Sequence, residues 1–177
     1  MIKIEIKPLK GISIEGVGEV FLGQSRQDVE KLLGRPPKPY STYSNSSALY
    51  NDYEFRLDFD AFEKVEFIEF IYGPFPEKTE LSIFGVNPFT IGAERLVEIL
   101  SENNNAEVDL SEAEFSYTFL NNSVGIWRQY TQKVVEEAIA ERKLSGKYEF
   151  NKSSIEDDLE NSRNFWTIGI GAADYYR

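Results

Sequence analysis

Hydrophobic and polar residues alternate at the start of the chain. Isoleucine occupies positions 2, 4 and 6, and charged residues occupy positions 3, 5 and 7, which is the two-residue period of a strand with one buried face. Trp166, Ile168 and Ile170 alternate in the same way and predict a final strand. A secretory signal would instead need an uninterrupted apolar stretch. The pattern predicts a strand at each end and a cytoplasmic location.

Two segments have the pattern of a β-hairpin and resemble each other. Residues 54–70 read EFRLDFDAFEKVEFIEF, and residues 114–130 read EFSYTFLNNSVGIWRQY. With one residue gapped at the turn, Glu54 aligns with Glu114, and the alternating apolar positions on both sides of the turn coincide. Each segment contains a strand, a short turn and a second strand. The repeat therefore predicts two hairpins.

A short helix precedes each hairpin. Ser25 is the expected N-cap of the first helix, Val29 belongs to its apolar stripe, and Gly34 ends it. The second helix begins after Gly92 and carries Leu96 in its stripe. Helices this short are not stable alone in water. Each is therefore expected to pack its stripe on a sheet.

These elements indicate two tandem modules within a single compact domain spanning residues 1–177. The first module covers residues 11–72 and the second covers residues 80–130, while residues 131–177 add a C-terminal helix that opens at Thr131 and the final strand. The expected fold is α+β, with one antiparallel sheet and the helices on one of its faces.

A long segment between the first helix and the first hairpin, residues 34–50, is rich in Pro, Ser and Tyr and lacks a core pattern. Loops of this length are often functional. Tyr40 and Tyr43 are therefore candidate partner-binding residues.

Composition narrows the chemistry. The 177 residues include neither His nor Cys, which excludes a disulfide, a zinc site built from these ligands and a His-based catalytic triad. The segment from Gly16 to Gly23 superficially resembles a dinucleotide fingerprint, but its sixth position is Phe21 where a glycine is needed. We expect no metal and no cofactor.

The charge balance indicates the kind of partner. The chain has 19 Lys and Arg against 30 Asp and Glu, a net charge of −11. Nucleic acids and anionic membranes are bound by clustered positive charge, so neither is expected as a partner. A basic protein is favoured instead, and the oligomeric state is left open.

The sheet face opposite the helices is the predicted binding surface. If Phe55 and Leu57 face the helices, strand alternation turns the neighbouring positions outward. Aromatic anchors among carboxylates are typical of protein interfaces. The alternative is that the C-terminal segment or another strand covers these aromatics. The predicted outward residues are Glu54, Asp58, Glu66, Ile68, Phe70, Tyr72, Glu114 and Trp127.

Part of the first module resembles a known protein module. The segment from Gly23 to Pro36 fits the pattern G-x-S/T-x-x-x-V-x-x-x-L-G-x-P, and Leu57-Asp58-Phe59-Asp60 follows in the hairpin. This is similar to the module shared by the β-lactamase inhibitor protein, which carries two in tandem, and the small lipoproteins of outer-membrane assembly. The resemblance implies a helix packed on an antiparallel sheet and protein binding by a sheet surface. A role as an extracellular inhibitor does not transfer, because the chain has no signal, lipid-bearing Cys or disulfide.

The predicted function is therefore non-catalytic. We expect an acidic protein-binding module, in the manner of a bacterial immunity protein or inhibitor that sequesters a basic toxin or nuclease. One alternative is an enzyme that uses only carboxylates, such as a glycan hydrolase, and another is a structural or assembly protein. A cleft with two facing acids of raised pKa would favour the enzyme, and a broad acidic and aromatic face would favour binding.

Overall fold

A computed structural model of the chain describes most of its residues. Four helices and eleven strands in two sheets occur in this part of the chain, and the fold is α+β as predicted. Tyr40 and Tyr43 lie outside the described residues. The described residues are 1–36, 46–73, 75–105, 107–146, 148–149 and 152–177.

The smaller sheet contains the predicted N-terminal strand. β1 (Ile2–Lys7), β2 (Gly11–Ile14) and β3 (Gly18–Phe21) form an antiparallel meander, and β7 (Thr79–Ser82) pairs with β1 in parallel. The strands thus form two sheets, whereas one antiparallel sheet was expected. The pairing of β1 with β7 joins segments far apart in the chain, which local patterns do not reveal.

The larger sheet has seven strands in the order β4-β5-β6-β11-β10-β9-β8. Both predicted hairpins form, as β5–β6 and β9–β10, and the final strand β11 lies between them. β4 lies in the segment that was predicted to be a loop, where Ala48 and Tyr50 are buried. The bounds are β4 (Ser47–Tyr50), β5 (Phe55–Phe59), β6 (Val65–Phe70), β8 (Val108–Asp109), β9 (Ser116–Phe119), β10 (Val124–Trp127) and β11 (Thr167–Gly171).

Four helices join these strands, and local signals explain where they begin and end. The side chain of Ser25 accepts a hydrogen bond from the backbone N–H of Asp28 at the start of the first helix, and Gly34 ends that helix with φ 83°. Thr131 caps the third helix in the same way. Both caps agree with the prediction. The bounds are α1 (Arg26–Leu33), α2 (Ala93–Asn104), α3 (Gln132–Leu144) and α4 (Lys152–Asn161).

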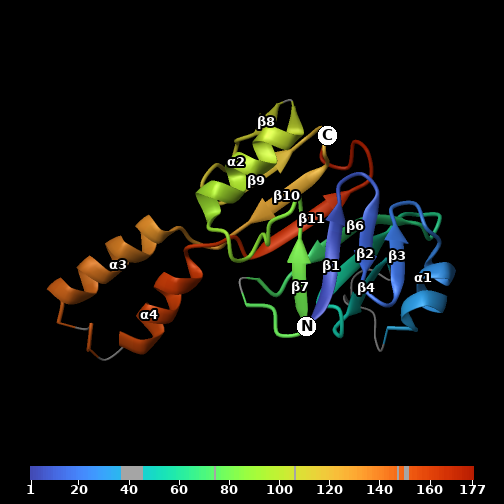
Figure 1. Ribbon diagram of the computed structural model, residues 1–177. Helices are drawn as coiled ribbons and strands as arrows, with labels where there is room; N and C mark the ends of the chain where they lie inside the picture. The colour runs from blue at the N-terminus through green and yellow to red at the C-terminus, as the bar shows by residue number, and fades with distance from the viewer. Residues whose placement is uncertain (37–45, 74, 106, 147, 150–151) are drawn as a thin grey trace.

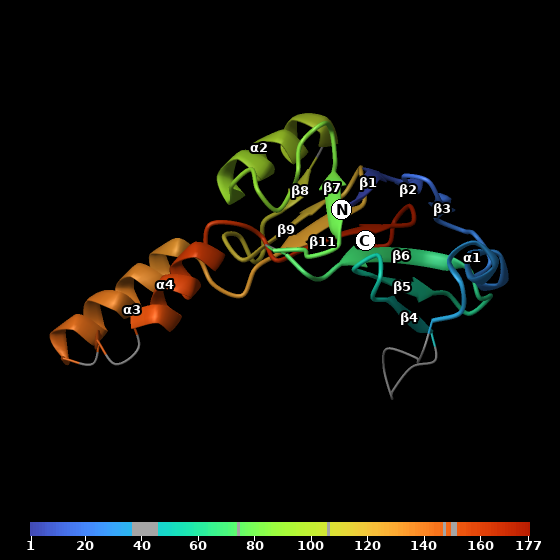
Figure 2. The same ribbon diagram turned by 60° about the horizontal axis from the view of Figure 1, so that its bottom comes forward.

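The small sheet and α2 lie over the same face of the large sheet (Figures 1 and 2). The hydrophobic core fills the space between them, and Val29 of α1 and Leu96 of α2 belong to it. No described helix or strand lies on the opposite face of the large sheet in Figure 2. We call this opposite face the outer face; its side chains include Arg56, Asp58, Phe67, Glu69, Thr118 and Trp127.

The helices α3 and α4 form a hairpin that projects from the two sheets (Figure 1). Val135 and Ile155 are the buried residues of this hairpin. Within the described ranges, no helix has the length and apolar character needed to cross a membrane.

Candidate binding face

Strand β6 does not alternate as its sequence suggested. Leu57 pairs with Ile68 and Asp58 with Phe67, but Phe59 pairs with Val65. Glu66 is therefore an extra residue in β6, a β-bulge that reverses which side chains face the core from that point onward.

The bulge corrects two predicted site residues. Ile68 and Phe70 are 0% and 1% exposed and belong to the core, so the prediction that they face outward is wrong. Phe67 and Glu69 take the outward positions instead. The pattern missed this because the run from Val65 to Phe70 has apolar residues in both phases of the alternation.

Glu54 is also absent from the outer face. Its side chain is buried, 4% exposed, and its backbone has φ 56°. One carboxylate oxygen accepts hydrogen bonds from the N–H groups of Glu77 (2.8 Å) and Lys78 (3.1 Å), and the other accepts from the N–H (3.0 Å) and hydroxyl (2.6 Å) of Thr79. Glu54 therefore fixes the start of β7 and is unavailable to a partner.

Glycines occupy the middle of the outer face. One row of paired positions crosses the sheet from Arg56 through Glu69, Gly169 and Gly125 to Thr118. A Cβ atom at Gly169 would overlap the ring of Phe67, and one at Gly125 would overlap the hydroxyl of Tyr176. The glycines thus make room for aromatic side chains that pack closely against the sheet.

The end of the chain folds back over these glycines. The N–H of Ala172 donates to the carbonyl of Glu66 (2.8 Å), and Ser123 donates to the carbonyl of Ala172 (2.9 Å). The ring of Tyr176 then packs edge-on against Phe67, with centroids 6.0 Å apart. The C-terminal segment therefore covers the centre of the outer face with tyrosines, not with a strand.

Trp127 remains accessible beside this cover. It is 41% exposed and points away from the core on the side opposite Val124 and Ile126. Its ring meets that of Trp166 edge to face at 6.1 Å, and Trp166 meets Tyr130 in the same way at 4.9 Å. Trp127 thus belongs to a cluster of aromatic rings that extends from the outer face toward the α3–α4 hairpin.

The charges of the outer face are held in place by one arginine. Nη2 of Arg56 lies 3.0 Å from a carboxylate oxygen of Asp58 and 3.0 Å from one of Glu69. The hydroxyl of Ser47 donates to the other oxygen of Asp58 at 2.5 Å. Burial raises the pKa of Glu69, and nearby Arg56 opposes this shift. Burial also raises the pKa of Tyr176.

These residues surround a shallow hollow of about 210 Å³. Its lining includes the carboxylate of Glu69, the hydroxyl-bearing side chains of Ser116 and Thr118, and the ring of Trp127. The hollow is a surface depression with polar and aromatic walls. Its chemistry suits hydrogen bonding and stacking against an incoming side chain.

The remaining predicted residues are dispersed. Asp58 and Glu66 lie on or beside the outer face, where both affect the pKa of Tyr175. The hydroxyl of Tyr72 donates to Asn51 at 3.1 Å, after the end of β6. Glu114 lines a different cavity, beside α2. The structure therefore places Asp58, Glu66 and Trp127 on or beside one face, with Asp58 and Glu66 near Tyr175 and Trp127 at the hollow lined by Glu69, but it does not gather the full predicted set.

Sequence reasoning missed Phe67, Glu69, Tyr175 and Tyr176. One signal could have found them: Gly169 and Gly171 alternate with isoleucines in β11. Alternate glycines in a strand mark a face that another group approaches closely. Among the described residues, no group of three or more Asp or Glu side chains is placed to hold a metal ion.

Comparison with protein families, curated proteins and solved structures gives no match for this chain. A function for this chain is therefore inferred from the geometry of its own residues.

Proposed function

We propose that this protein is a non-catalytic, acidic binding module of the cytoplasm that sequesters a basic protein, such as a toxin or nuclease, in the manner of an immunity protein. The observation that carries the proposal is the outer face. It presents exposed Trp127 beside Glu69 and exposed Tyr175 beside Asp58 and Glu66, on a sheet without a covering helix or strand among the described residues.

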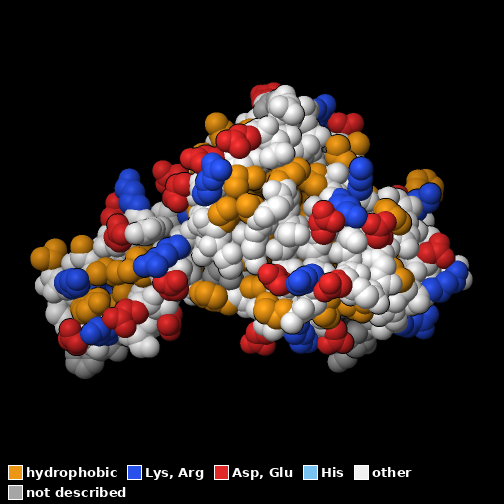
Figure 3. Space-filling model, viewed as in Figure 1, with side chains coloured by type: hydrophobic (Ala, Val, Ile, Leu, Met, Phe, Trp, Pro, Cys, Tyr) orange, Lys and Arg blue, Asp and Glu red, His pale blue; other side chains and the backbone are white. Residues whose placement is uncertain are grey.

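Charge and rigidity both support a protein partner. The net charge of −11 attracts a basic surface over a distance of about 8 Å at physiological salt. The side of the molecule opposite the outer face has acidic and basic side chains intermixed, with no broad basic area (Figure 3). Aromatic side chains with few rotatable bonds lose little entropy on binding and often dominate the binding energy.

The first test places a photo-crosslinking amino acid at position 127 and uses the protein encoded by the neighbouring gene as the candidate partner. The control carries the same group at position 62, where Phe62 is 82% exposed in the turn between β5 and β6. We expect a basic protein to be cross-linked from position 127 and not from position 62.

With the purified pair, Trp127→Ala should weaken binding by about 2 kcal/mol or more, and the association rate should fall as salt rises. Equal binding by the wild type and Trp127→Ala would show that the outer face is not the partner-binding surface.

A carboxylate-based glycan hydrolase is the second candidate, and one observation favours it. Glu69, whose pKa is raised by burial, lies in a hollow beside Trp127, and aromatic rings often stack on sugars. Against this role, Arg56 lies between Glu69 and Asp58 and forms an ion pair with each of them. Hydrolysis of oligosaccharides by the wild type that is lost in Glu69→Gln would favour this candidate over binding alone.

A further inference from the structure

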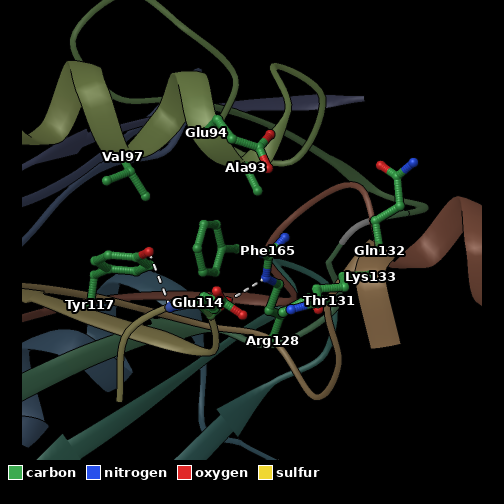
Figure 4. A pocket seen from close by; sticks show the side chains of 10 residues that line it. All are labelled: Ala93, Glu94, Val97, Glu114, Tyr117, Arg128, Thr131, Gln132, Lys133 and Phe165. Atoms are coloured by element: carbon green, nitrogen blue, oxygen red, sulfur yellow. Dashed lines mark hydrogen bonds between the residues drawn. The ribbon is translucent and has the colours of Figure 1, made fainter. Parts of the chain in front are cut away.

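A second cavity lies between α2 and the base of the α3–α4 hairpin (Figure 4). It has a volume of about 370 Å³ and is separate from the hollow on the outer face. Its lining comes from the first turns of α2, from β9 and the segment before it, from the residue after β10, from the start of α3, which includes Lys133, and from Phe165 before β11. A volume of this size accommodates a small metabolite.

One side of the cavity is apolar. Phe165 is buried, and its ring meets that of Tyr117 edge to face, with centroids 5.9 Å apart and planes inclined by 86°. Ala93 and Val97 of α2 face these rings across the cavity (Figure 4). This wall suits an aliphatic or aromatic side chain.

Arg128 forms the polar end of the cavity and is only 7% exposed. Its Nε donates to the carbonyl of Glu114 (2.6 Å), its Nη1 donates to the carbonyl of Ser162 (3.2 Å), and its guanidinium lies over the ring of Phe165 at 5.0 Å. Both acceptors are neutral. Among the described residues no carboxylate pairs with Arg128 directly. Burial lowers the pKa of Arg128, and the charges of Glu94 and Glu114 oppose this shift from beyond ion-pair distance.

A buried guanidinium without a paired carboxylate is costly. Of the five N–H groups of a guanidinium, the two bonds to carbonyls use only some, and the side chain lines the cavity. The planar fork of such a group matches a carboxylate with two parallel hydrogen bonds. Arg128 is thus fixed in position to receive an anionic group.

Two acids lie at the same cavity. Glu94, in the first turn of α2, and Glu114 are both exposed and line the opening, and neither belongs to an ion pair within the described ranges. The backbone of Glu114 is held at φ 76° by hydrogen bonds from its N–H to the hydroxyl of Tyr117 (3.1 Å) and from Arg128 to its carbonyl. Strained residues held from both sides often mark binding sites.

We propose that this cavity binds a free α-amino acid with an apolar side chain. Arg128 receives the carboxylate, Glu94 and Glu114 receive the ammonium group, and the side chain packs against Phe165 and Val97. A molecule with both charges satisfies the buried guanidinium and the two unpaired acids together, which a simple anion or cation does not. The site is independent of the outer face and of its partner.

Calorimetric titration with L-leucine, L-methionine and L-phenylalanine tests the proposal. We expect at least one to bind with a dissociation constant near 1 mM or lower, which is about −4 kcal/mol. For phenylalanine, the matched compounds are 3-phenylpropionate, which lacks the ammonium group, and phenethylamine, which lacks the carboxylate. For whichever amino acid binds most tightly, each such one-charge analogue should bind about tenfold more weakly or worse.

Two variants of the same helix separate the ammonium contact from general charge effects. Glu94→Gln should weaken amino-acid binding about tenfold but should not weaken the binding of the ammonium-free analogue, because the negative charge that is lost repels an anion. The control is Glu98→Gln, since Glu98 is exposed, pairs with Arg95 at 2.7 Å and does not line the cavity; it should weaken neither. Circular dichroism verifies that both variants are folded.

Three results would overturn the proposal. The first is no binding of any of the three amino acids at about 10 mM by the folded wild type. The second is an ammonium-free analogue that binds as tightly as its amino acid. The third is equal loss of binding in Glu94→Gln and Glu98→Gln, which would indicate long-range charge and not a contact. Arg128→Gln, if it folds, should bind no amino acid.

Discussion

The ring of Tyr175 lies parallel to the ring of Phe67 on the outer face, with centroids 4.6 Å apart and planes inclined by 5°. This contact fastens the C-terminal segment to β6. It depends on the bulge at Glu66, because without the extra residue Phe67 would face the core. A single inserted position in one strand therefore determines which aromatic rings the molecule presents.

The packing of Phe67 on Gly169 predicts an energetic coupling between them. A Cβ atom at Gly169 would overlap the ring of Phe67, so we expect Gly169→Ala to lower the free energy of unfolding by about 1 to 3 kcal/mol. In a Phe67→Ala background the ring is gone, and the same change should cost much less. Urea unfolding of the four proteins of this double-mutant cycle measures the coupling. Equal costs in both backgrounds would contradict the close packing.

Trp127→Ala should affect stability only slightly. The side chain is partly exposed and contributes one edge-to-face contact with Trp166, which is worth about 1 kcal/mol. The control is Phe165→Ala, a buried ring whose loss should cost about 3 to 5 kcal/mol. Thermal melts of both variants compare the two effects. A large drop for Trp127→Ala would mean that its ring is part of the core and not of a binding face.

Glu54 and Glu114 offer a matched pair, since both have positive φ values, 56° and 76°. The carboxylate of Glu54 accepts four hydrogen bonds from residues 77–79, so Glu54→Ala should destabilise the protein by at least about 2 kcal/mol. Glu114→Ala keeps the same backbone strain but removes only an exposed carboxylate, and should stay within about 0.5 kcal/mol. Chemical denaturation distinguishes these outcomes. Similar losses of stability for both variants would mean that the backbone conformation at positive φ, and not the hydrogen bonds of the Glu54 carboxylate, accounts for the loss.

Glu69 predicts a specific pH dependence. Burial raises its pKa above the usual 4.5 in the folded chain, so the folded state holds the proton where the unfolded state has released it. Folding therefore loses stability as pH rises from the ordinary pKa through the raised one. Glu69→Gln cannot ionise, and its stability relative to the wild type should increase from about pH 4 to about pH 7. A difference that stays constant over this range, measured by urea unfolding, would contradict the raised pKa.

The sequence predicted those features whose signals are local. Ser25, Gly34 and Thr131 mark helix ends through hydrogen bonds to residues three or four positions away, and the pattern of each hairpin lies within seventeen residues, 54–70 and 114–130. The fold class followed from these elements. Tertiary pairing was not accessible in this way, which is why the second sheet and its parallel pair were missed.

The candidate site was predicted only in part for two physical reasons. The bulge in β6 reverses the alternation, and the run VEFIEF fits either phase equally well, so the sequence could not choose between Phe67 and Ile68. The cavity beside α2 joins Glu94, Arg128 and Phe165, which are distant in the chain. Glu114 was predicted to be a site residue, but its position at this cavity depends on its left-handed backbone conformation, which no sequence pattern predicted.

The order of strands in the large sheet has a consequence for biosynthesis. β11 pairs with β6 on one side and β10 on the other, yet it is the last of these strands to leave the ribosome. Until residues 167–171 emerge, the halves formed by residues 47–70 and 108–127 each expose a free inner edge, and such edges pair readily with other chains. The nascent protein is thus most exposed to aggregation in the interval between the synthesis of β10 and that of β11, and its larger sheet is completed when β11 inserts.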